Sequence, residues 1–361
     1  VTMVEDDKGN IKIIDDGQLI IVNEKIKAVL KNGEALPEGL NPDSVIVLDT
    51  EGIIFPGLIN AHDHIHYNQN PLWNLTEKYE NRYQWPDEQA CAVNVKYSKK
   101  MLYRHKYWNL MGEAVKYCEV KQIAGGTTAF QGSPNGAHKF CRILARNMDV
   151  TDNFGVDKMS SYVRPVTDVK DSKIREWIEE MENDELDALF FHISEGIDEK
   201  SRAEFDFLVE KGLDRKETII IHGTAMTEEQ IKHAGEKNMT VVWSPTSNLL
   251  LYGETANIPA MVKYGVNVCL GTDWAPSGGK NILNELKIAY EYNKAHFNGV
   301  LNYRDMVEMV TINPADGVEW TDYVGRLKPG LYADITVIPV SYTHLRAHET
   351  SLHLVCRLLL E

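Results

Sequence analysis

The sequence has neither the cysteine pattern of a disulfide-stabilised protein nor an apolar run of membrane-spanning length. Five cysteines are scattered through 361 residues, and none forms a Cys-x-x-Cys pair. An odd, scattered set of cysteines is typical of a reducing compartment, so we expect a cytoplasmic protein. No apolar run approaches the ~18 residues needed to cross a membrane, and no signal peptide is recognisable. The chain starts at Val1 rather than Met, which is compatible with a lost leader.

Basic residues are too few for a typical nucleic-acid-binding protein. The chain has 38 Lys and Arg against 53 Asp and Glu, giving a formal net charge of −15. This balance disfavours a nucleic-acid partner. Hydrophobic residues make up 43% of the chain, which is enough for a substantial core. The length suits one large domain with a smaller companion, because an α/β barrel alone takes ~250 residues.

The pattern of apolar residues divides the chain into two parts. Before Pro56, the stretches NIKIIDDG, QLIIVNEKIKAVL and SVIVLDTEGIIF read as short strands separated by turns, which predicts a small β unit. After Pro56, β-rich runs alternate with helical patterns. The expected helices span residues 110–124, 171–183, 202–212, 227–237, 281–298 and 303–310. Repeated strand–helix alternation predicts a parallel sheet, and this many units suggest a closed eight-stranded barrel.

Five side chains that can bind a metal lie at the ends of four expected strands. His62 and His64 are two positions apart in PGLINAHDHIHY, so on an extended chain both imidazoles point to the same face. His192 in LFFHISEG, His222 in TIIIHGT and Asp273 in VNVCLGTDW each end an apolar run. Because the loops at the carboxyl ends of barrel strands converge, we expect these five residues to share one site. Four imidazoles and a carboxylate predict a site for a divalent metal ion.

Each of these residues also has a structural interpretation. A His-x-His pair occurs by chance in many soluble proteins, and His222 fits a buried core histidine equally well when taken alone. Asp273 could cap a helix or form a turn, and Glu195 could be an ordinary loop carboxylate before Gly196. The metal interpretation rests on the four strand ends taken together.

From residue 1 to about 339, the chain resembles the amidohydrolase superfamily of metal-dependent hydrolases. The resemblance rests on PGLINAHDH, GGTTAF, HISEG, IIHGT, SPTSNLLL, LGTDWAPSGG, NPAD and VGRLKPGLYADITVI, which stand in the family's order. It implies a distorted TIM barrel at residues 57–320, with a flanking β-sandwich formed by residues 1–56 and 321–340. The most similar branch holds cytosine and guanine deaminases, triazine hydrolases and imidazolonepropionase.

The resemblance also implies roles for individual residues. His62, His64, His192 and Asp273 would bind one divalent ion, with zinc expected and iron as the alternative. His222 would be a further ligand or would orient the attacking water, and Glu195, three residues after His192, would transfer protons. Ser247 and Asn248 match a Ser-Asn pair that supports the strand-seven loop.

The number of metal ions is predicted from one missing residue. Binuclear members of the superfamily carry a carboxylated lysine on the fourth strand. The matching stretch MSSYVRPV contains no lysine, and Lys158 lies just before it. We therefore expect a mononuclear site.

The expected activity is hydrolysis of a carbon–nitrogen bond other than a peptide bond in a small molecule. Metal-activated hydroxide would attack an sp² carbon of a deaminase-like or cyclic-amide substrate, with Glu195, His222 and Asp273 as catalytic groups. Candidate substrate-binding residues are His66, Trp274, Arg82 and Tyr83. A dechlorinating or ring-opening hydrolase of the same branch is an alternative, as is a non-catalytic binding or assembly relative. A homodimer is expected only by analogy with the family.

The last segment, residues 341–361, departs from the family pattern. His344 and His348 are four positions apart, as on one helical face, and His353 is nearby. We do not interpret them as a second zinc site, because the segment resembles translated sequencing-adapter read-through and lacks the strands that would complete the sandwich. Our hypothesis is a non-native tail that replaces the natural C-terminus.

Overall fold

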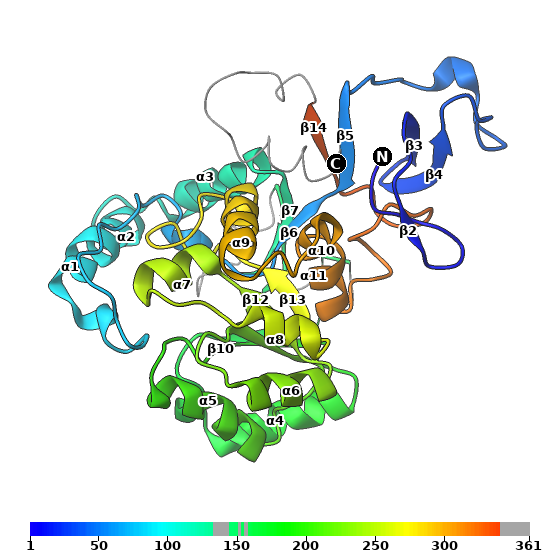
Figure 1. Cartoon of the computed structure of the whole chain (residues 1–361). Coiled ribbons are helices and arrows are strands. Elements are labelled where there is room, and N and C mark those ends of the chain that lie inside the picture. Colours follow the sequence, from blue (N-terminus) through cyan, green and yellow to red (C-terminus); the bar gives the residue numbers. More distant parts are fainter. Residues whose placement is uncertain (133–143, 151–152, 155–157, 340–361) are drawn as a thin grey trace.

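Two parallel sheets form the centre of the molecule (Figure 1). The computed structural model describes residues 1–132, 144–150, 153–154 and 158–339. The first sheet has the order β6-β7-β8, formed by Leu58–Asn60, Thr127–Phe130 and Arg146–Asn147. The second has the order β13-β12-β11-β10-β9, formed by Asn267–Leu270, Thr240–Trp243, Thr218–His222, Ala188–Ile193 and Met159–Tyr162.

The two sheets meet where β6 lies beside β13. Ala61 N donates to Leu270 O at 3.0 Å, and Asp273 N donates to His62 O at 3.0 Å. A parallel bridge between Asp63 and Asp273 continues this contact. In the described residues β8 and β9 belong to different sheets. The predicted parallel strand–helix architecture is therefore present, with its carboxyl strand ends on one side.

Helices cover the strands on the outside. Those of eight or more residues are α3 (Met111–Ala124), α4 (Asp171–Glu182), α5 (Glu199–Glu210), α6 (Glu228–Glu236) and α9 (Ile282–His296). Shorter helices are α1 (Gln89–Cys91), α2 (Tyr97–Tyr103), α7 (Pro245–Leu251), α8 (Ile258–Lys263), α10 (Tyr303–Glu308) and α11 (Ile312–Gly317). All residues of β10 and β11 are buried, as expected for parallel strands covered on both faces.

The long helices agree with the sequence prediction except at their ends. The expected capping box at the start of α6 is present, with Gln230 N donating to Thr227 Oγ1 at 3.2 Å. The predicted start of α5 at residue 202 is wrong by three residues. Asp198 caps the helix instead, because its Oδ1 accepts a 2.9 Å hydrogen bond from Ser201 N.

The N-terminal segment forms short pairs of antiparallel strands. β1 (Val4–Glu5) pairs with β2 (Ile11–Lys12), and β3 (Gly17–Val22) pairs with β4 (Lys25–Lys31). β5 (Gly52–Pro56) pairs with β14 (Ile335–Pro339), so the strand just before the first parallel sheet lies beside the last strand of the described chain.

The strand predicted in SVIVLDTEGIIF is confined to its second half. Ile46, Val47 and Leu48 are 86%, 82% and 80% exposed and belong to no strand of the described residues. An apolar run becomes a strand only where another strand accepts its hydrogen bonds, and no such partner lies beside these three residues in the described chain. The suspected non-native tail, residues 341–361, lies outside the described residues.

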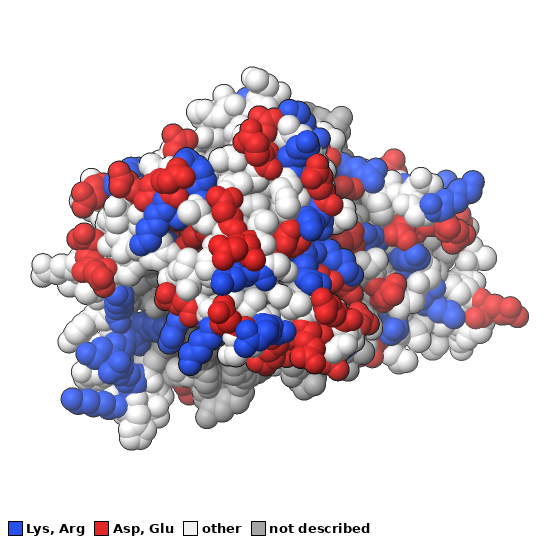
Figure 2. Space-filling view, turned by 90° about the horizontal axis from the view of Figure 1, so that it is seen from below, with Lys and Arg blue, Asp and Glu red and all other residues white. Residues whose placement is uncertain are grey.

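The surface carries both signs of charge. Figure 2 shows acidic and basic side chains interspersed over one face, with basic groups gathered at the lower left edge, the side on which Figure 1 draws α1 and α2. None of the helices in the described part of the chain has the length and apolar character needed to span a membrane.

Candidate metal centre and its cavity

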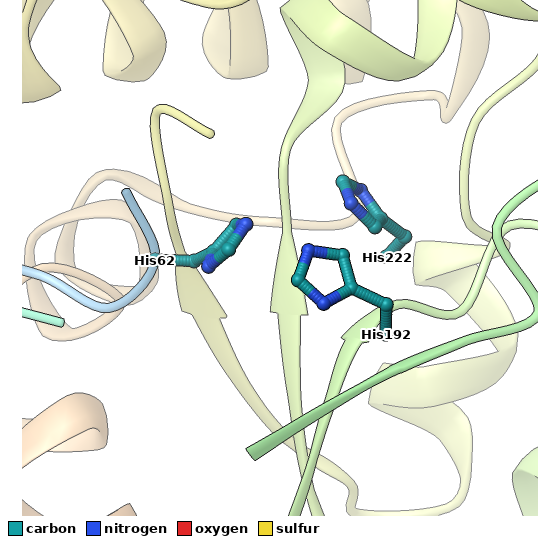
Figure 3. A group of neighbouring side chains, drawn as sticks. All are labelled: His62, His192 and His222. Atoms are coloured by element: carbon teal, nitrogen blue, oxygen red, sulfur yellow. The ribbon is translucent and has the colours of Figure 1, made fainter. Parts of the chain in front are cut away.

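The predicted ligands meet at the carboxyl ends of the strands. His62 and His64 follow β6, His192 lies in β10, His222 ends β11, and Asp273 follows β13. Figure 3 shows the imidazoles of His62, His192 and His222 directed toward one another. Ligand atoms of these three histidines lie within 4.8 Å of one another, as do those of the second group, His62, His64 and Asp273.

Two of these residues adopt backbone conformations that side chains rarely take. His222 has φ of 77° and Asp273 has φ of 61°, both in the left-handed region. Such strain persists only where the surrounding structure holds it, and it is concentrated at functional sites. The side chains of both strained residues turn into the shared space.

The unpaired nitrogens of the cluster fit a divalent cation. Nε2 of His62 and Nε2 of His222 are buried and have no hydrogen-bond partner among the described residues. Burying an unpaired polar atom is costly, and coordination of an ion is one way to satisfy it. Imidazole nitrogens with one carboxylate oxygen suit zinc or iron.

The His62 ring is oriented by a hydrogen-bonded network. Its Nδ1 lies 2.8 Å from Gln131 Oε1, so Nδ1 carries the hydrogen and Nε2 is free to bind a metal. Gln131 Nε2 in turn donates to Asp149 at 3.2 Å and to Ser161 Oγ at 3.0 Å. A hydrogen bond to the ring nitrogen that does not bind the metal fixes the tautomer of a ligating histidine.

Asp273 and His222 are held by the residues after β12. Ser247 Oγ donates to Asp273 Oδ2 at 2.5 Å, and Asn248 Nδ2 lies 3.0 Å from His222 Nδ1. Asp273 Oδ1 faces the histidines, 3.4 Å from His62 Nε2 and 3.5 Å from His64 Nε2. The carboxylate thus has one oxygen fixed by a hydroxyl and the other available at the cluster.

Burial keeps several of these imidazoles neutral in the metal-free protein. It lowers the pKa of His64 to about 3 and lowers the pKa values of His192 and His222. Burial alone would raise the pKa of Asp273, but the adjacent imidazoles of His62, His222 and His64 lower it to about 2. Neutral imidazoles and an ionised carboxylate are the forms that coordinate a metal.

Glu195 reaches the same centre from the loop after β10. Its Oε2 lies 3.7 Å from His222 Nε2 and 3.4 Å from Arg82 Nε, while its Oε1 accepts a 2.7 Å hydrogen bond from Tyr252 OH. Arg82 is further held by its Nη2, which donates to Val163 O at 2.7 Å. One carboxylate oxygen is therefore anchored by a phenol, and the other lies beside His222 of the histidine cluster.

A cavity of about 690 Å³ opens onto this centre. His66, Arg82 and Trp274 line it together with Glu195 and the histidines His62, His64 and His192. Trp274 forms an aromatic wall with Trp85 and Tyr67, at ring-centroid distances of 5.2 Å and 5.1 Å. A cavity walled by aromatic rings with polar groups at one end suits a flat, partly apolar small molecule.

Two residues considered in the sequence are not part of the described cavity lining. Tyr83 is not among the described residues that line it, and its hydroxyl donates to Glu204. Lys158 Nζ donates to the backbone oxygen of Asp184, and this lysine is likewise absent from the described lining.

Sequence reasoning missed Gln131, Tyr252 and Lys99 as residues of the site. Gln131 follows β7 in TTAFQG, so its place at a strand end was a usable signal. Tyr252 follows helix α7 and Lys99 lies within helix α2, and neither position has a motif of its own. Ser247 and Asn248 were expected to support a loop, and their contacts extend to two predicted ligands.

Comparison with known sequences gives related deaminases. The chain is 28% identical over 357 residues to a 5-methylthioadenosine/S-adenosylhomocysteine deaminase from Caldicellulosiruptor saccharolyticus, covering 89% of this chain and 80% of that protein. A deaminase of the same name from Pyrococcus furiosus is 24% identical, covering 92% of this chain and 83% of that protein.

Solved structures share the fold at low sequence identity. Atrazine chlorohydrolase TrzN from Arthrobacter aurescens, complexed with zinc, has a TM-score of 0.75 at 17% identity, with 98% of this chain and 89% of that chain covered. An adenosine deaminase from Xanthomonas campestris with bound zinc has a TM-score of 0.70 at 18% identity. The match covers 95% of this chain and 84% of that chain. The model of the amidohydrolase family matches residues 53–351, and the chain belongs to this family.

Proposed function

We propose that this chain is a metal-dependent deaminase that removes an amino group from a 6-aminopurine nucleoside. As a member of the amidohydrolase family, it is a hydrolase of carbon–nitrogen bonds. The observation that carries the proposal is the convergence of Glu195 with four histidines and Asp273 at one end of an aromatic-walled cavity. The relatives named as deaminases of 5-methylthioadenosine and S-adenosylhomocysteine support the choice of a purine.

His62, His64, His192 and Asp273 would hold one divalent ion, zinc by preference, with His222 as a further ligand or as a group that orients water. When bound, the ion lowers the pKa of a water molecule toward ~7 and so supplies hydroxide at neutral pH. The absence of Lys158 from the described cavity lining supports a single ion.

The chain's own residues would move the protons. The reaction consumes one water, breaks the bond between the ring carbon and its amino nitrogen, and releases ammonia. Asp273 Oδ1, facing His62 and His64, is in position to accept a hydrogen bond from the attacking water. Glu195 Oε2 accepts a proton at the same centre and returns it to the substrate nitrogen, while Tyr252 and Arg82 keep its carboxylate in place.

The substrate would lie against the aromatic wall. Trp274 and Tyr67 both line the cavity, and the Trp274 ring lies 6.4 Å from the His64 ring, so a purine that reaches the centre would stack against this wall. Arg82 is engaged by Glu195 and Val163, so its proposed role is to position Glu195, while His66 remains a candidate substrate contact.

The proposal also covers the closed barrel and the flanking β-sandwich. We infer that β6 to β13 form a distorted eight-stranded barrel at residues 57–320, with residues 1–56 and 321–340 contributing a β-sandwich. The support is the contact of β6 with β13 and the pairing of β5 with β14. The fold of the zinc-containing neighbours is consistent with this arrangement.

The test is ammonia release by the zinc-loaded protein. Adenosine, 5-methylthioadenosine and S-adenosylhomocysteine are assayed beside guanine, cytosine, a chlorotriazine and an imidazolone, with chloride release and ring opening followed in parallel. We expect ammonia from at least one 6-aminopurine nucleoside and loss of this activity in Glu195→Gln. Chloride release or ring opening without ammonia from any purine would contradict the proposal.

A further inference from the structure

One end of the cavity lies away from the metal centre and is formed by the helical segment after the first strand. This segment comprises α1, the π-helical turn η4 (Ala92–Lys96) and α2. Of its residues, those that line the cavity are Cys91, Val95, Lys96, Lys99 and Tyr103. None of the predicted metal ligands comes from it, so this end is free to bind a part of the substrate that does not react.

Lys96 and Lys99 both line this end, and neither forms an ion pair with a carboxylate of the described residues; Lys96 Nζ donates to Pro86 O, which leaves Lys99 as the candidate for binding an anion. Lys99 Nζ donates to Tyr67 OH at 3.1 Å and lies 4.2 Å from the centre of the Tyr67 ring. No ion pair joins it to a carboxylate of the described residues, and burial alone lowers its pKa to about 8. An ammonium group has three donors, and the Tyr67 hydroxyl takes only one of them.

The carboxylates of the described cavity lining are engaged by other side chains, and none of them comes from the helical segment that carries Lys99. Asp63 accepts from Asn68, and Asp273 accepts from Ser247. Glu195 is paired with Arg82 and Tyr252, and Asp149 accepts hydrogen bonds from Gln131. The end of the cavity formed by α1, η4 and α2 therefore carries a positive charge that no carboxylate of the described lining balances.

The sequence around Lys99 strengthens this asymmetry. Residues 89–112 contain no Asp or Glu, although the chain as a whole has 53 of them. The same stretch carries Lys96, Lys99, Lys100, Arg104 and Lys106. A run of positive charge beside a cavity in an acidic protein raises the local concentration of anions.

A chain of contacts connects Lys99 with the metal centre. The Tyr67 ring lies 4.4 Å from the His66 ring, and His66 lies 6.1 Å from the His64 ring, measured between centroids. His66 Nδ1 is buried and has no hydrogen-bond partner among the described residues. A substrate whose ring reaches the metal centre can therefore extend past His66 toward Lys99.

We propose that Lys99 binds a negatively charged group of the substrate, a carboxylate or a phosphate, remote from the carbon that is hydrolysed. His66 Nδ1 supplies a second polar contact along the same path. This inference rests on the proposed deaminase function and adds the class of substrate: an aminated ring with an anionic substituent. Lys99 then acts as a determinant of specificity rather than as a catalytic residue.

Two matched pairs of substrates separate the sources of negative charge. S-Adenosylhomocysteine is compared with its decarboxylated analogue, which keeps the ammonium group, and adenosine 5′-monophosphate is compared with adenosine. For each pair the ratio of kcat/KM, anion-bearing substrate over the substrate without the anionic group, is measured for the zinc-loaded wild type, Lys99→Met and Lys99→Arg. Lys100→Met is the matched control, since Lys100 lies over Tyr97 on the same helix and is absent from the described cavity lining.

We expect the wild type to prefer the anion-bearing member of one pair, and we expect Lys99→Met to reduce that ratio by about 10- to 100-fold, the range for losing a hydrogen bond to a charged group. Lys99→Arg should retain most of the preference, and Lys100→Met should leave it unchanged. A preference for S-adenosylhomocysteine over its decarboxylated analogue identifies a carboxylate site. A preference for adenosine 5′-monophosphate over adenosine identifies a phosphate site. Equal ratios in wild type and Lys99→Met overturn the proposal.

A second readout separates this inference from the proposed function. The lysines are reductively dimethylated with ¹³C, and the Lys99 resonance is assigned by its absence in Lys99→Met. Glutarate and inorganic phosphate are then titrated. If none of the nucleosides is deaminated, the deaminase proposal fails, and the anion site is retained if either anion shifts the Lys99 resonance. No shift with either anion rejects the site.

Discussion

His62 Nδ1 lies 2.8 Å from Gln131 Oε1, and the amide of Gln131 is fixed in turn by Asp149 and Ser161. This contact joins the loop after β6 to the residue after β7. Because the amide oxygen can only accept, the hydrogen is held on Nδ1, and the opposite nitrogen of His62 is left for a metal. Gln131 is therefore a positioning residue for the first predicted ligand.

Replacing Gln131 with Met should weaken metal binding by about 10- to 100-fold, the usual cost of losing an outer contact to a ligating histidine. The side chain keeps its length but loses the acceptor for Nδ1. Competition with a chromogenic zinc chelator measures the affinity. Gln18→Met, at an exposed position on β3, is the control, and equal affinities in the two variants would count against the network.

The metal content of the protein tests the ligand set directly. Wild type purified without chelator should contain close to one zinc or iron per chain, and the double variant His62→Ala/His64→Ala should contain almost none. Elemental analysis gives both numbers. The matched control is His105→Ala, at a position outside the described cluster. Two ions per chain in the wild type would contradict the mononuclear prediction.

Replacing Glu195 with Gln should lower kcat by about 10²- to 10⁴-fold, because the amide cannot accept and return a proton. Glu195 Oε2 lies 3.7 Å from His222 Nε2, so the proton-accepting atom is at the centre. The metal content should stay at the wild-type level, which distinguishes lost proton transfer from a lost site. Glu199→Gln, exposed at the start of α5, is the control. An active Glu195→Gln enzyme would remove Glu195 from the mechanism.

The buried carboxyl of Glu285 predicts a pH dependence of stability. Burial raises its pKa from 4.5 to about 8, although Thr246 N and Thr246 Oγ1 both donate to it at 2.8 Å. Between these pH values the folded state holds a proton that the unfolded state has released. The stability that Glu285 contributes is therefore complete below pH 4.5 and falls as the pH rises, by about 1.4 kcal/mol per pH unit.

Glu285→Gln removes this titration. The free energy of unfolding of the wild type minus that of Glu285→Gln should decrease as the pH is raised through this window, and it should level off above about pH 8. Urea unfolding at a series of pH values, in one metal state throughout, measures it. Glu291→Gln, exposed on the same helix α9, should show no such trend. A difference that is independent of pH would mean that Glu285 is already ionised in the folded protein.

Local sequence patterns predicted those parts of the molecule that depend on neighbouring residues. The capping box of Thr227 and Gln230 and the extents of α3, α4 and α9 follow from short-range spacing, and the structure contains them. The positions of His192 and His222 at the ends of apolar strands could be read in the same way, because strand polarity and side-chain alternation are local properties. Their role as ligands stays a prediction.

Only the tertiary structure decided which distant residues support that site and which apolar runs remain exposed. The contacts of Gln131 with His62 and of Tyr252 with Glu195, and the position of Lys99 over Tyr67, join segments that are far apart in the chain. Ile46, Val47 and Leu48 read as a strand but form none in the described chain. In both cases the reason is physical: hydrogen bonds and packing between remote segments depend on how strands are arranged in space, and a local pattern holds no information about its partners.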